Sequence, residues 1–339
     1  MSQIGRRQFL TAAGALLAAP HVSHANTSTK LPVLGYLSPG AKVPPKVLQN
    51  WLFFKHLREL GWVDGKTLRV EYAFSGKNLG LLRELAAMLV AKNVDVIWTA
   101  SPWGAVAAAQ ATSTIPIVFW RVAFPQKLGI VDSLPRPGRN VTGVAWFADA
   151  TIFVKRVELL REIAPDAVRV ALLSTTSIFR DVSGKVVEVQ WLRDKFDAAL
   201  SDLGFVRQRF AIEKPTDFRT AFAAIGKWGA DAMIVTDVPL TINARKQIVD
   251  FARQHNLVDM YYTNKWVEAG GLVAYGIVLN PTLLRTADMV DRILRGAKPA
   301  DIPVELPSEY ELVVNLKTAD ALGLNISPSF MLRVDQVIE

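Results

Sequence analysis

The chain of 339 residues contains no cysteine and only four histidines. The absence of cysteine excludes disulfide bonds, thiolate metal sites, a cysteine nucleophile and a lipid-modified N-terminal cysteine. Two of the histidines lie within the first 25 residues, so a metal site built from several histidines is nearly excluded as well. We therefore predict a protein without a metal or cofactor.

Catalytic motifs are also missing. The sequence has no G-x-S-x-G elbow, no Walker loop, no H-E-x-x-H pair and no glycine-rich dinucleotide turn. His56 and His255 lie on predicted helices, where a surface or helix-terminal role is the simpler interpretation. No group of residues has the pattern of an active site, and we predict that the protein is not an enzyme.

Charge and composition exclude two further classes of protein. The chain carries 39 Lys and Arg against 31 Asp and Glu, but the basic residues are scattered rather than clustered, which gives a nucleic-acid partner little support. Half of the residues are apolar, which is too many for a disordered chain. The length is enough for one large domain or two ordinary ones.

The first 25 residues have the pattern of an export signal. Arg6-Arg7-Gln8-Phe9-Leu10 precedes a short apolar run and then small residues at Ser23 and Ala25. The adjacent arginines resemble the twin-arginine signal. The apolar run is only about half of the ~20 residues that a membrane-spanning helix needs. We predict cleavage near Ala25 and a soluble, monomeric periplasmic protein.

The remaining chain repeats one order of elements twice. Apolar runs that predict buried strands alternate with amphipathic stretches that predict helices, and such alternation is typical of parallel βαβ units. The predicted strands are 32–37, 68–74, 94–99 and 115–120, then 168–173, 208–212, 232–236 and 258–262. The predicted helices are 48–60, 81–91 and 103–111, then 191–203, 218–228 and 243–255. A helix at 281–295, a strand at 311–315 and a short helix at 317–322 follow.

This repetition predicts an α/β protein of two doubly wound parallel-sheet lobes joined by a multi-strand hinge. We place the N-terminal lobe at 31–146 plus 277–303 and the C-terminal lobe at 147–276 plus 304–339. A single eight-unit barrel is the alternative. The irregular spacing and the Pro- and Gly-rich pause at 135–143 count against it.

Ligands of open α/β sheets bind beyond the carboxyl ends of the strands, which here are the loops 38–41, 101–104, 174–177 and 237–241. Ser38 and Ser174 end predicted strands. Ser101 begins a helix whose free N–H groups suit a carboxylate, although it could equally cap that helix and do nothing more. Asp237 is expected to accept a hydrogen bond from a donor group of the ligand.

Aromatic residues gather near the same strand ends. We expect Trp103 or Phe124 to stack on a ligand, and about half of the aromatic residues to be core. Arg121 follows a predicted strand and is either a solvated loop residue or a clamp on a ligand anion. The candidate ligand-binding residues are Ser38, Ser101, Trp103, Arg121, Phe124, Ser174, Asp237, Tyr262, Trp266 and Tyr275.

Segments along the whole chain beyond the signal resemble the tryptophan/tyrosine-type ABC transporter substrate-binding protein family. They include 32–38 (PVLGYLS), 57–62 (LRELGW), 115–119 (IPIVF), 140–144 (NVTGV), 155–160 (KRVELL), 268–272 (EAGGL) and 292–299 (RILRGAKP). The resemblance implies a type I periplasmic-binding-protein fold with a small-molecule solute held between two lobes. It also implies delivery to an ABC permease and its ATPase subunit in the inner membrane.

Two departures from the family pattern concern the expected pocket. Ala123-Phe124-Pro125 stands where the family usually has Gly-Asp-Pro, and Ala100-Ser101-Pro102-Trp103 stands where it commonly has a Gly-Thr-Pro-type loop. A lost carboxylate and two added aromatic rings change what the pocket would hold, so the solute is either amino-acid-like or an aromatic or carboxylate-bearing molecule. A ligand-sensing protein that serves a membrane receptor stays an alternative, whereas a repressor would need an N-terminal helix-turn-helix.

Overall fold

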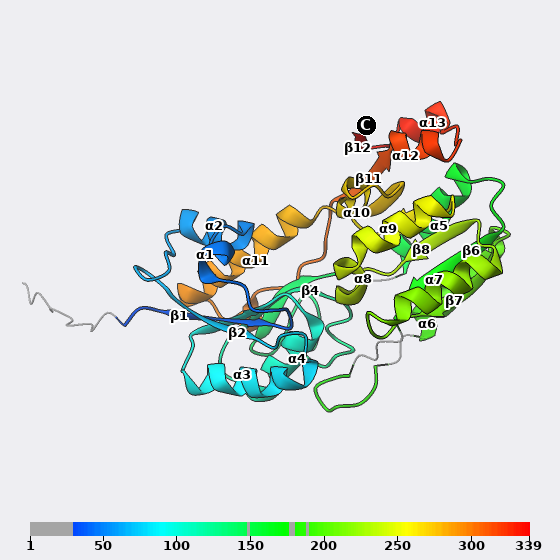
Figure 1. Ribbon diagram of the computed structural model, residues 1–339. Helices are drawn as coiled ribbons and strands as arrows, with labels where there is room; N and C mark the ends of the chain where they lie inside the picture. The colour runs from blue at the N-terminus through cyan, green and yellow to red at the C-terminus, as the bar shows by residue number, and fades with distance from the viewer. Residues whose placement is uncertain (1–29, 148–149, 176–179, 188–189) are drawn as a thin grey trace, which may run out of the picture. The chain divides into compact units, whose positions relative to one another are not determined.

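The computed structural model describes residues 30–339 apart from 148–149, 176–179 and 188–189. The predicted signal at residues 1–25 and half of the predicted loop 174–177 therefore lie outside the described residues. In the described part, strands and helices alternate through both halves of the chain (Figure 1), as the hydrophobic pattern predicts.

The first lobe is built on a wholly parallel sheet of five strands in the order β2-β1-β3-β4-β5. Its strands are β1 (Val33–Ser38), β2 (Arg69–Phe74), β3 (Val96–Thr99), β4 (Ile117–Val122) and β5 (Val141–Ala145). Both faces of the sheet are apolar and covered, which is why β1 and β3 are continuous buried runs rather than alternating ones.

Helices cover the two faces of this sheet. One face packs against α3 (Leu82–Ala91) and α4 (Pro102–Ala111), which follow the short 3₁₀ turn η1 (Leu79–Leu81). The other packs against α1 (Pro45–Leu48), α2 (Leu52–Glu59) and α11 (Leu279–Leu294), which returns from much later in the chain (Figure 1). The first lobe is thus completed by a helix that follows most of the second lobe in the sequence.

The second lobe has a sheet of seven strands in the order β12-β11-β10-β9-β8-β6-β7. Its strands are β6 (Arg169–Ser174), β7 (Val206–Ala211), β8 (Ala232–Val235), β9 (Val258–Tyr261), β10 (Val273–Ile277), β11 (Tyr310–Asn315) and β12 (Gln336–Ile338). Its helices are α5 (Thr151–Ile163), α6 (Gln190–Asp202), α7 (Asp217–Trp228), α8 (Pro239–Asn243), α9 (Arg245–Gln254), α10 (Asn264–Glu268), α12 (Leu316–Ala321) and α13 (Pro328–Met331).

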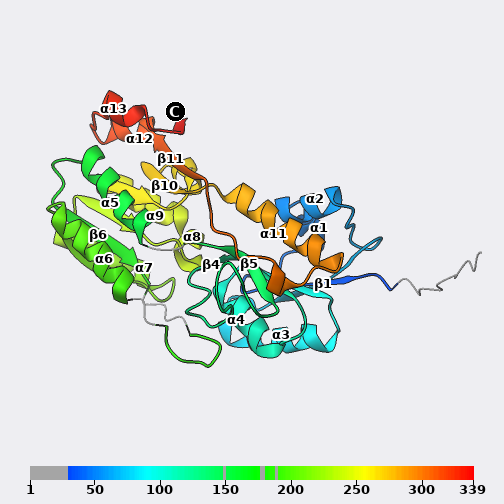
Figure 2. The ribbon, with the colours of Figure 1, turned by 180° about the vertical axis from the view of Figure 1, so that it is seen from behind.

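The chain passes between the two lobes three times. The first passage follows β5 and the second is Val278, between β10 and α11. The third follows the 3₁₀ turn η2 (Pro299–Asp301) and leads to β11, and it can be followed in dark orange in Figure 2. On this last passage Glu305 pairs with the end of β5, since its N–H donates to the Gly143 carbonyl at 3.0 Å and its carbonyl accepts from Ala145 at 2.9 Å. Adjacent crossings of this kind form a hinge.

The structure confirms the predicted α/β class with parallel sheets in two lobes, and it corrects several details. The second sheet is not wholly parallel, because β11 runs antiparallel to β10, and β12 was not predicted. The predicted helix 48–60 begins later, at Leu52, because the backbone at Trp51 is extended, and Leu48 instead ends the separate short helix α1. The predicted loop 237–241 contains the start of α8. The exact lobe boundaries stay a prediction.

Candidate ligand site

The backbone is strained where β4 ends. Arg121 lies inside β4 rather than after it, with φ of 60°, and Phe124 has φ of 54°. The pairing of β4 with β5 shifts register between Trp120 and Val122, so that Arg121 forms a bulge. Non-glycine residues adopt this left-handed region only where the surroundings enforce it, and such positions cluster at ligand sites.

The bulge places the Arg121 guanidinium between two indole rings and an acid. It lies 3.8 Å from the ring centre of Trp146 and 5.4 Å from that of Trp120. Its Nη2 donates to Asp237 Oδ2 at 2.9 Å. Burial lowers the pKa of Arg121, and the negative charge of Asp237 opposes that change. Arg121 is thus not a solvated loop residue, and the anion that it holds in this structure is Asp237; a contact with a ligand anion stays a prediction.

Asp237 follows β8, so its contact with Arg121 joins the second lobe to the first. Its side chain is only 3% exposed, against 22% for Arg121. Its other oxygen, Oδ1, accepts from Trp266 Nε1 at 3.2 Å. Trp266 is core, stacked on Tyr261 with the ring centres 4.6 Å apart. Both oxygens of Asp237 therefore have partners within the protein.

A second guanidinium lies deeper in the second lobe. Arg156 of α5 is 2% exposed, its guanidinium lies 3.7 Å from the ring centre of Tyr262, and its Nε donates to the Tyr275 carbonyl at 2.7 Å. Its Nη1 is buried with no hydrogen-bond partner among the described residues. Burial lowers the pKa of Arg156 to about 10, although Tyr262, Asp237 and Tyr275 oppose the change. A buried cation with a spare donor is poised to hold an anion.

An aromatic pocket of about 260 Å³ opens beside Phe124. Phe124 meets Phe147 and Trp191 edge to face, at 5.0 Å and 5.5 Å between ring centres. Lys127 lies over the Trp191 ring at 4.4 Å. The Trp191 Nε1 atom is buried without a partner among the described residues. The pocket is lined by Phe124, Pro125, Gln126, Lys127, Leu134, Ala145, Phe147 and Trp191.

The pocket and the two guanidinium groups are connected through aromatic rings. Phe147 contacts Phe153 at 5.1 Å, and Phe153 in turn contacts Tyr262 at 5.9 Å, the ring on which Arg156 lies. Trp146, beside Phe147, packs on Arg121. We call Arg121, Arg156, Asp237 and Tyr262 the arginine cluster, and Phe124, Lys127, Phe147 and Trp191 the aromatic pocket.

The predicted serines Ser38 and Ser101 accept hydrogen bonds within their own turns, whereas Ser174 takes part in strand pairing. Ser101 Oγ accepts from the Gly104 N–H at 3.1 Å and so caps α4, as Ser38 Oγ accepts from Gly40 at 3.2 Å. The Ser174 carbonyl accepts from Ile212 at 2.9 Å. Trp103 is partly buried against the core beneath α3 and α4. The role of these four residues in binding stays a prediction.

The structure brings six of the ten predicted residues together, in different roles. Arg121, Phe124 and Asp237 face polar or aromatic partners in the cluster or the pocket. Tyr262 and Trp266 are at most 4% exposed and serve as core rings that support the charged groups. Tyr275 is half-buried, and the arginine cluster uses its carbonyl rather than its ring.

Sequence reasoning missed Arg156, Phe147 and Trp191. A signal for Arg156 was present, because it lies four residues after Ile152 and four before Leu160, on the buried stripe of α5. An arginine on such a stripe must be paired or bind something, since an unpaired buried charge is costly.

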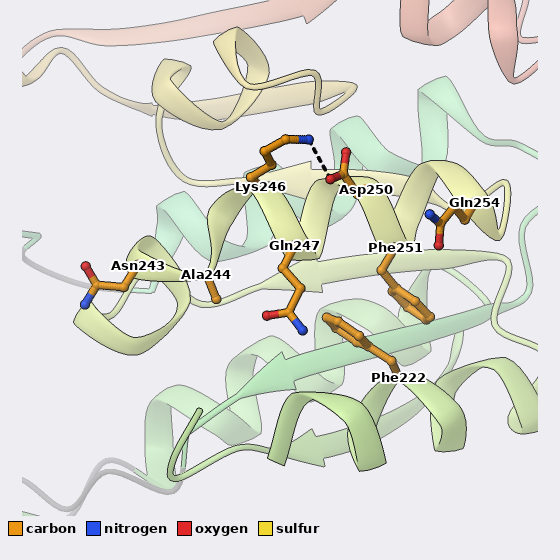
Figure 3. A pocket seen from close by; sticks show the side chains of 8 residues that line it. All are labelled: Phe222, Asn243, Ala244, Lys246, Gln247, Asp250, Phe251 and Gln254. Carbon is orange, nitrogen blue, oxygen red and sulfur yellow. Dashed lines mark hydrogen bonds and ion pairs between the residues drawn. The ribbon is translucent and has the colours of Figure 1, made fainter. Parts of the chain in front are cut away.

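A larger groove lies elsewhere on the second lobe, between α7 and α9. Its volume is about 640 Å³, and it contains none of the predicted site residues. Phe222 and Phe251 stack on each other inside it, and Lys246 is already paired with Asp250 at 2.6 Å (Figure 3). Its charged groups satisfy each other, so the arginine cluster is the better candidate.

The described residues contain no group of three or more His, Asp or Glu side chains arranged to hold a metal ion. None of the helices within the described ranges combines the length and the apolar character that a membrane crossing requires.

Comparison with known proteins agrees with this architecture. A curated tyrosine-binding protein of Clostridioides difficile (strain R20291) is 26% identical over 273 residues, which is 80% of this chain and 75% of that protein. A Streptococcus pneumoniae ABC domain in complex with L-Trp matches with a TM-score of 0.77 and 24% identity, over 91% of this chain and 100% of that one. A Vibrio cholerae conserved domain protein matches with a TM-score of 0.78, also at 24% identity, over 91% of this chain and 100% of that one.

These solved structures show a shared type I periplasmic-binding-protein fold. The model of the family described as ABC transporter substrate binding protein matches residues 52–338, nearly the whole of the described chain. That family consists of substrate-binding proteins and not of enzymes. The chain belongs to the ABC transporter substrate binding protein family.

Proposed function

We propose that this protein is the solute-binding component of an ABC importer. It captures a small organic solute between its two lobes and delivers it to a membrane permease with its ATPase subunit. Membership of the substrate-binding family supports the first half of this proposal. The permease and the ATPase are the partners that such a component requires.

The observation that carries the proposal is the Arg121–Asp237 pair. It joins the strand ends of the two lobes, at 2.9 Å, next to a buried arginine with a spare donor. A ligand that contacts groups of both lobes binds the closed arrangement more tightly than the open one and so shifts the hinge toward closure. A transport component needs this coupling, because the permease must distinguish loaded from empty protein.

The chemistry of the site favours a solute with a carboxylate and an aromatic or apolar body. The arginine cluster offers guanidinium donors, which match carboxylates in geometry and charge. The aromatic pocket offers edge and face contacts to a ring. The curated relative binds tyrosine and one solved neighbour holds L-Trp, which agrees with an amino-acid-like or aromatic carboxylate ligand.

We also propose that the protein works in the periplasm, as a monomer, after export and cleavage near Ala25. The support is the segment with Arg6-Arg7 followed by a short apolar run.

A sensing role, in which the loaded protein signals to a membrane receptor, would use the same site. Uptake separates the two functions. Deletion of the gene abolishes uptake of the radiolabelled solute if the protein is a transport component. It leaves uptake intact and removes only a response if the protein is a sensor.

The proposal is tested on purified protein with a thermal-shift screen of amino acids, aromatic acids and small amides. A bound solute at a hundredfold excess over its Kd stabilises the protein by about 2.7 kcal/mol. X-ray scattering with the strongest hit should then give a smaller radius of gyration. Binding without any change of shape contradicts a hinged transport component.

A further inference from the structure

The unpartnered polar atoms around the candidate site have one property in common. Three nitrogen atoms are buried without hydrogen-bond partners among the described residues: Arg156 Nη1, Trp191 Nε1 and Arg245 Nε. The Arg245 guanidinium lies 5.4 Å from the ring centre of Trp266. All three are nitrogens that can only donate. Buried polar groups are normally paired, so the ligand that completes this site supplies acceptors.

Within the arginine cluster of the described structure, the carboxylate that an ammonium group could use is Asp237, and both of its oxygens already accept hydrogen bonds. Asp237 accepts from Arg121 and from Trp266, one bond to each oxygen, and its side chain is 3% exposed. An α-ammonium placed there would compete with a guanidinium for the same oxygens and would lie beside another positive charge. This arrangement disfavours an amino acid, whose ammonium requires an acceptor of its own.

The charges of the described site residues lead to the same conclusion. The arginine cluster holds Arg121 and Arg156 against Asp237 alone, and Asp237 is near enough for its charge to oppose the fall in the pKa of Arg156. The aromatic pocket adds Lys127 and contains no acidic residue among those that line it. A ligand with one negative charge and no positive charge compensates this excess better than a zwitterion does.

The volume of the aromatic pocket sets the size of the ligand's body. An apolar cavity of about 150 Å³ holds a benzene ring. At about 260 Å³, the pocket therefore accommodates one ring with a short chain that leads from it. Phe124, Phe147 and Trp191 provide ring edges and faces on which a ligand ring can pack.

We propose that the natural ligand is an aromatic carboxylate without an α-ammonium group, with its carboxylate at Arg156 Nη1 and its ring in the aromatic pocket. This proposal rests on the proposed function and narrows its solute class. Asp237 then acts as a positioning residue that holds Arg121, rather than as a receptor for the ligand.

Matched pairs of compounds test the proposal by titration calorimetry on the purified full chain. The pairs are 3-phenylpropanoate and phenylalanine, 3-(4-hydroxyphenyl)propanoate and tyrosine, and indole-3-propanoate and tryptophan. Within each pair the two molecules differ only in the ammonium group. We expect the acid of at least one pair to bind at least tenfold more tightly than its amino acid.

The failure of this proposal differs from the failure of the proposed function. Equal or tighter binding of the amino acids overturns the inference that the ligand lacks an ammonium group. It does not contradict the proposed solute-binding function. Absence of binding by every acid overturns it too. If a broad screen of sugars, amides and amines also finds no ligand, the solute-binding function itself is contradicted.

Charge variants test whether the preference for the acid over the amino acid arises at this site. Lys127→Glu introduces an acceptor beside the aromatic pocket. It should reduce the ratio of the affinity for the acid to the affinity for the matching amino acid at least fivefold. The matched control is Lys46→Glu, an exposed residue of α1, which packs on the opposite face of the first sheet from the 127–128 segment. An equal change in both variants would reflect net charge alone and would contradict the assignment.

A milder variant guards against loss of folding. Trp191→Phe keeps a ring in the pocket and removes the unpartnered Nε1 donor. We expect it to weaken binding of the preferred acid three- to tenfold with an unchanged melting temperature. Unchanged affinity would show that this donor does not face the ligand and would count against the proposed pose.

Discussion

Replacing Arg156 by methionine tests whether this arginine stabilises the fold or binds the ligand. Burial lowers the pKa of Arg156 to about 10 from its ordinary 12.5, so folding makes the charged form about 3 kcal/mol less favourable than it is in the unfolded chain, although Arg156 stays charged at pH 7. Methionine keeps an unbranched apolar stem between Phe153 and Tyr262 and removes that penalty. Against this gain, the Tyr275 carbonyl loses a donor, which costs about 1–3 kcal/mol. The free energy of unfolding should therefore change by no more than about 2 kcal/mol in either direction.

The same substitution should greatly weaken ligand binding. A hydrogen bond from a charged donor contributes about 1.5–3 kcal/mol, or roughly 10- to 150-fold in Kd. Urea unfolding of the ligand-free protein measures the first effect, and calorimetry with 3-phenylpropanoate measures the second. A loss of stability above about 3 kcal/mol together with unchanged affinity would refute the reasoning, because Arg156 would then be a structural residue only.

Three further predictions concern the fold and export. Gly276→Ala should destabilise the protein by about 1–3 kcal/mol or more in urea unfolding, because a Cβ there would lie 1.7 Å from the Tyr262 carbonyl oxygen; a neutral result would contradict this packing. Burial raises the pKa of Asp259 to about 6 from 3.8, so its contribution to stability is full below about pH 4 and is lost as the pH rises through about 6. The unfolding free energy of wild type relative to Asp259→Asn should hence fall by up to about 3 kcal/mol between pH 4 and pH 7, and a flat difference would show that Asp259 does not titrate in this range. Finally, Arg6-Arg7→Lys-Lys should abolish appearance of the protein in the periplasm in a fractionation assay, whereas normal export would leave an ordinary secretory signal.

The fold could be predicted largely from the hydrophobic pattern. Largely apolar runs such as 96–99 and 232–236 are typical of strands buried on both faces, and the intervening amphipathic stretches have the period of helices. Ser101-Pro102 correctly marked the start of α4. The strand at 311–315 was predicted, but its antiparallel direction was missed because the pairing direction of a strand leaves no mark on its own residues.

The site was harder to predict because its members meet through the tertiary fold. Arg121 and Asp237 were both identified from their places at strand ends, but their pairing across 116 positions could not be read from the sequence. Asp237 was expected to meet a ligand donor, and in the structure both of its oxygens have protein partners. Arg156 was detectable in principle, from its place on the buried stripe of α5. Its spare donor depends on the positions of Tyr262 and Tyr275, which only the fold provides.

A crystal structure of the protein with the tightest-binding compound of the matched pairs tests the central claim most directly. We expect a carboxylate oxygen within about 3 Å of Arg156 Nη1 and the ligand ring packed against Phe124, Phe147 and Trp191. We also expect the Arg121–Asp237 pair to persist in the complex. Ligand density in the groove between α7 and α9, or an ammonium group of the ligand seated on Asp237 in place of Arg121, would contradict the account.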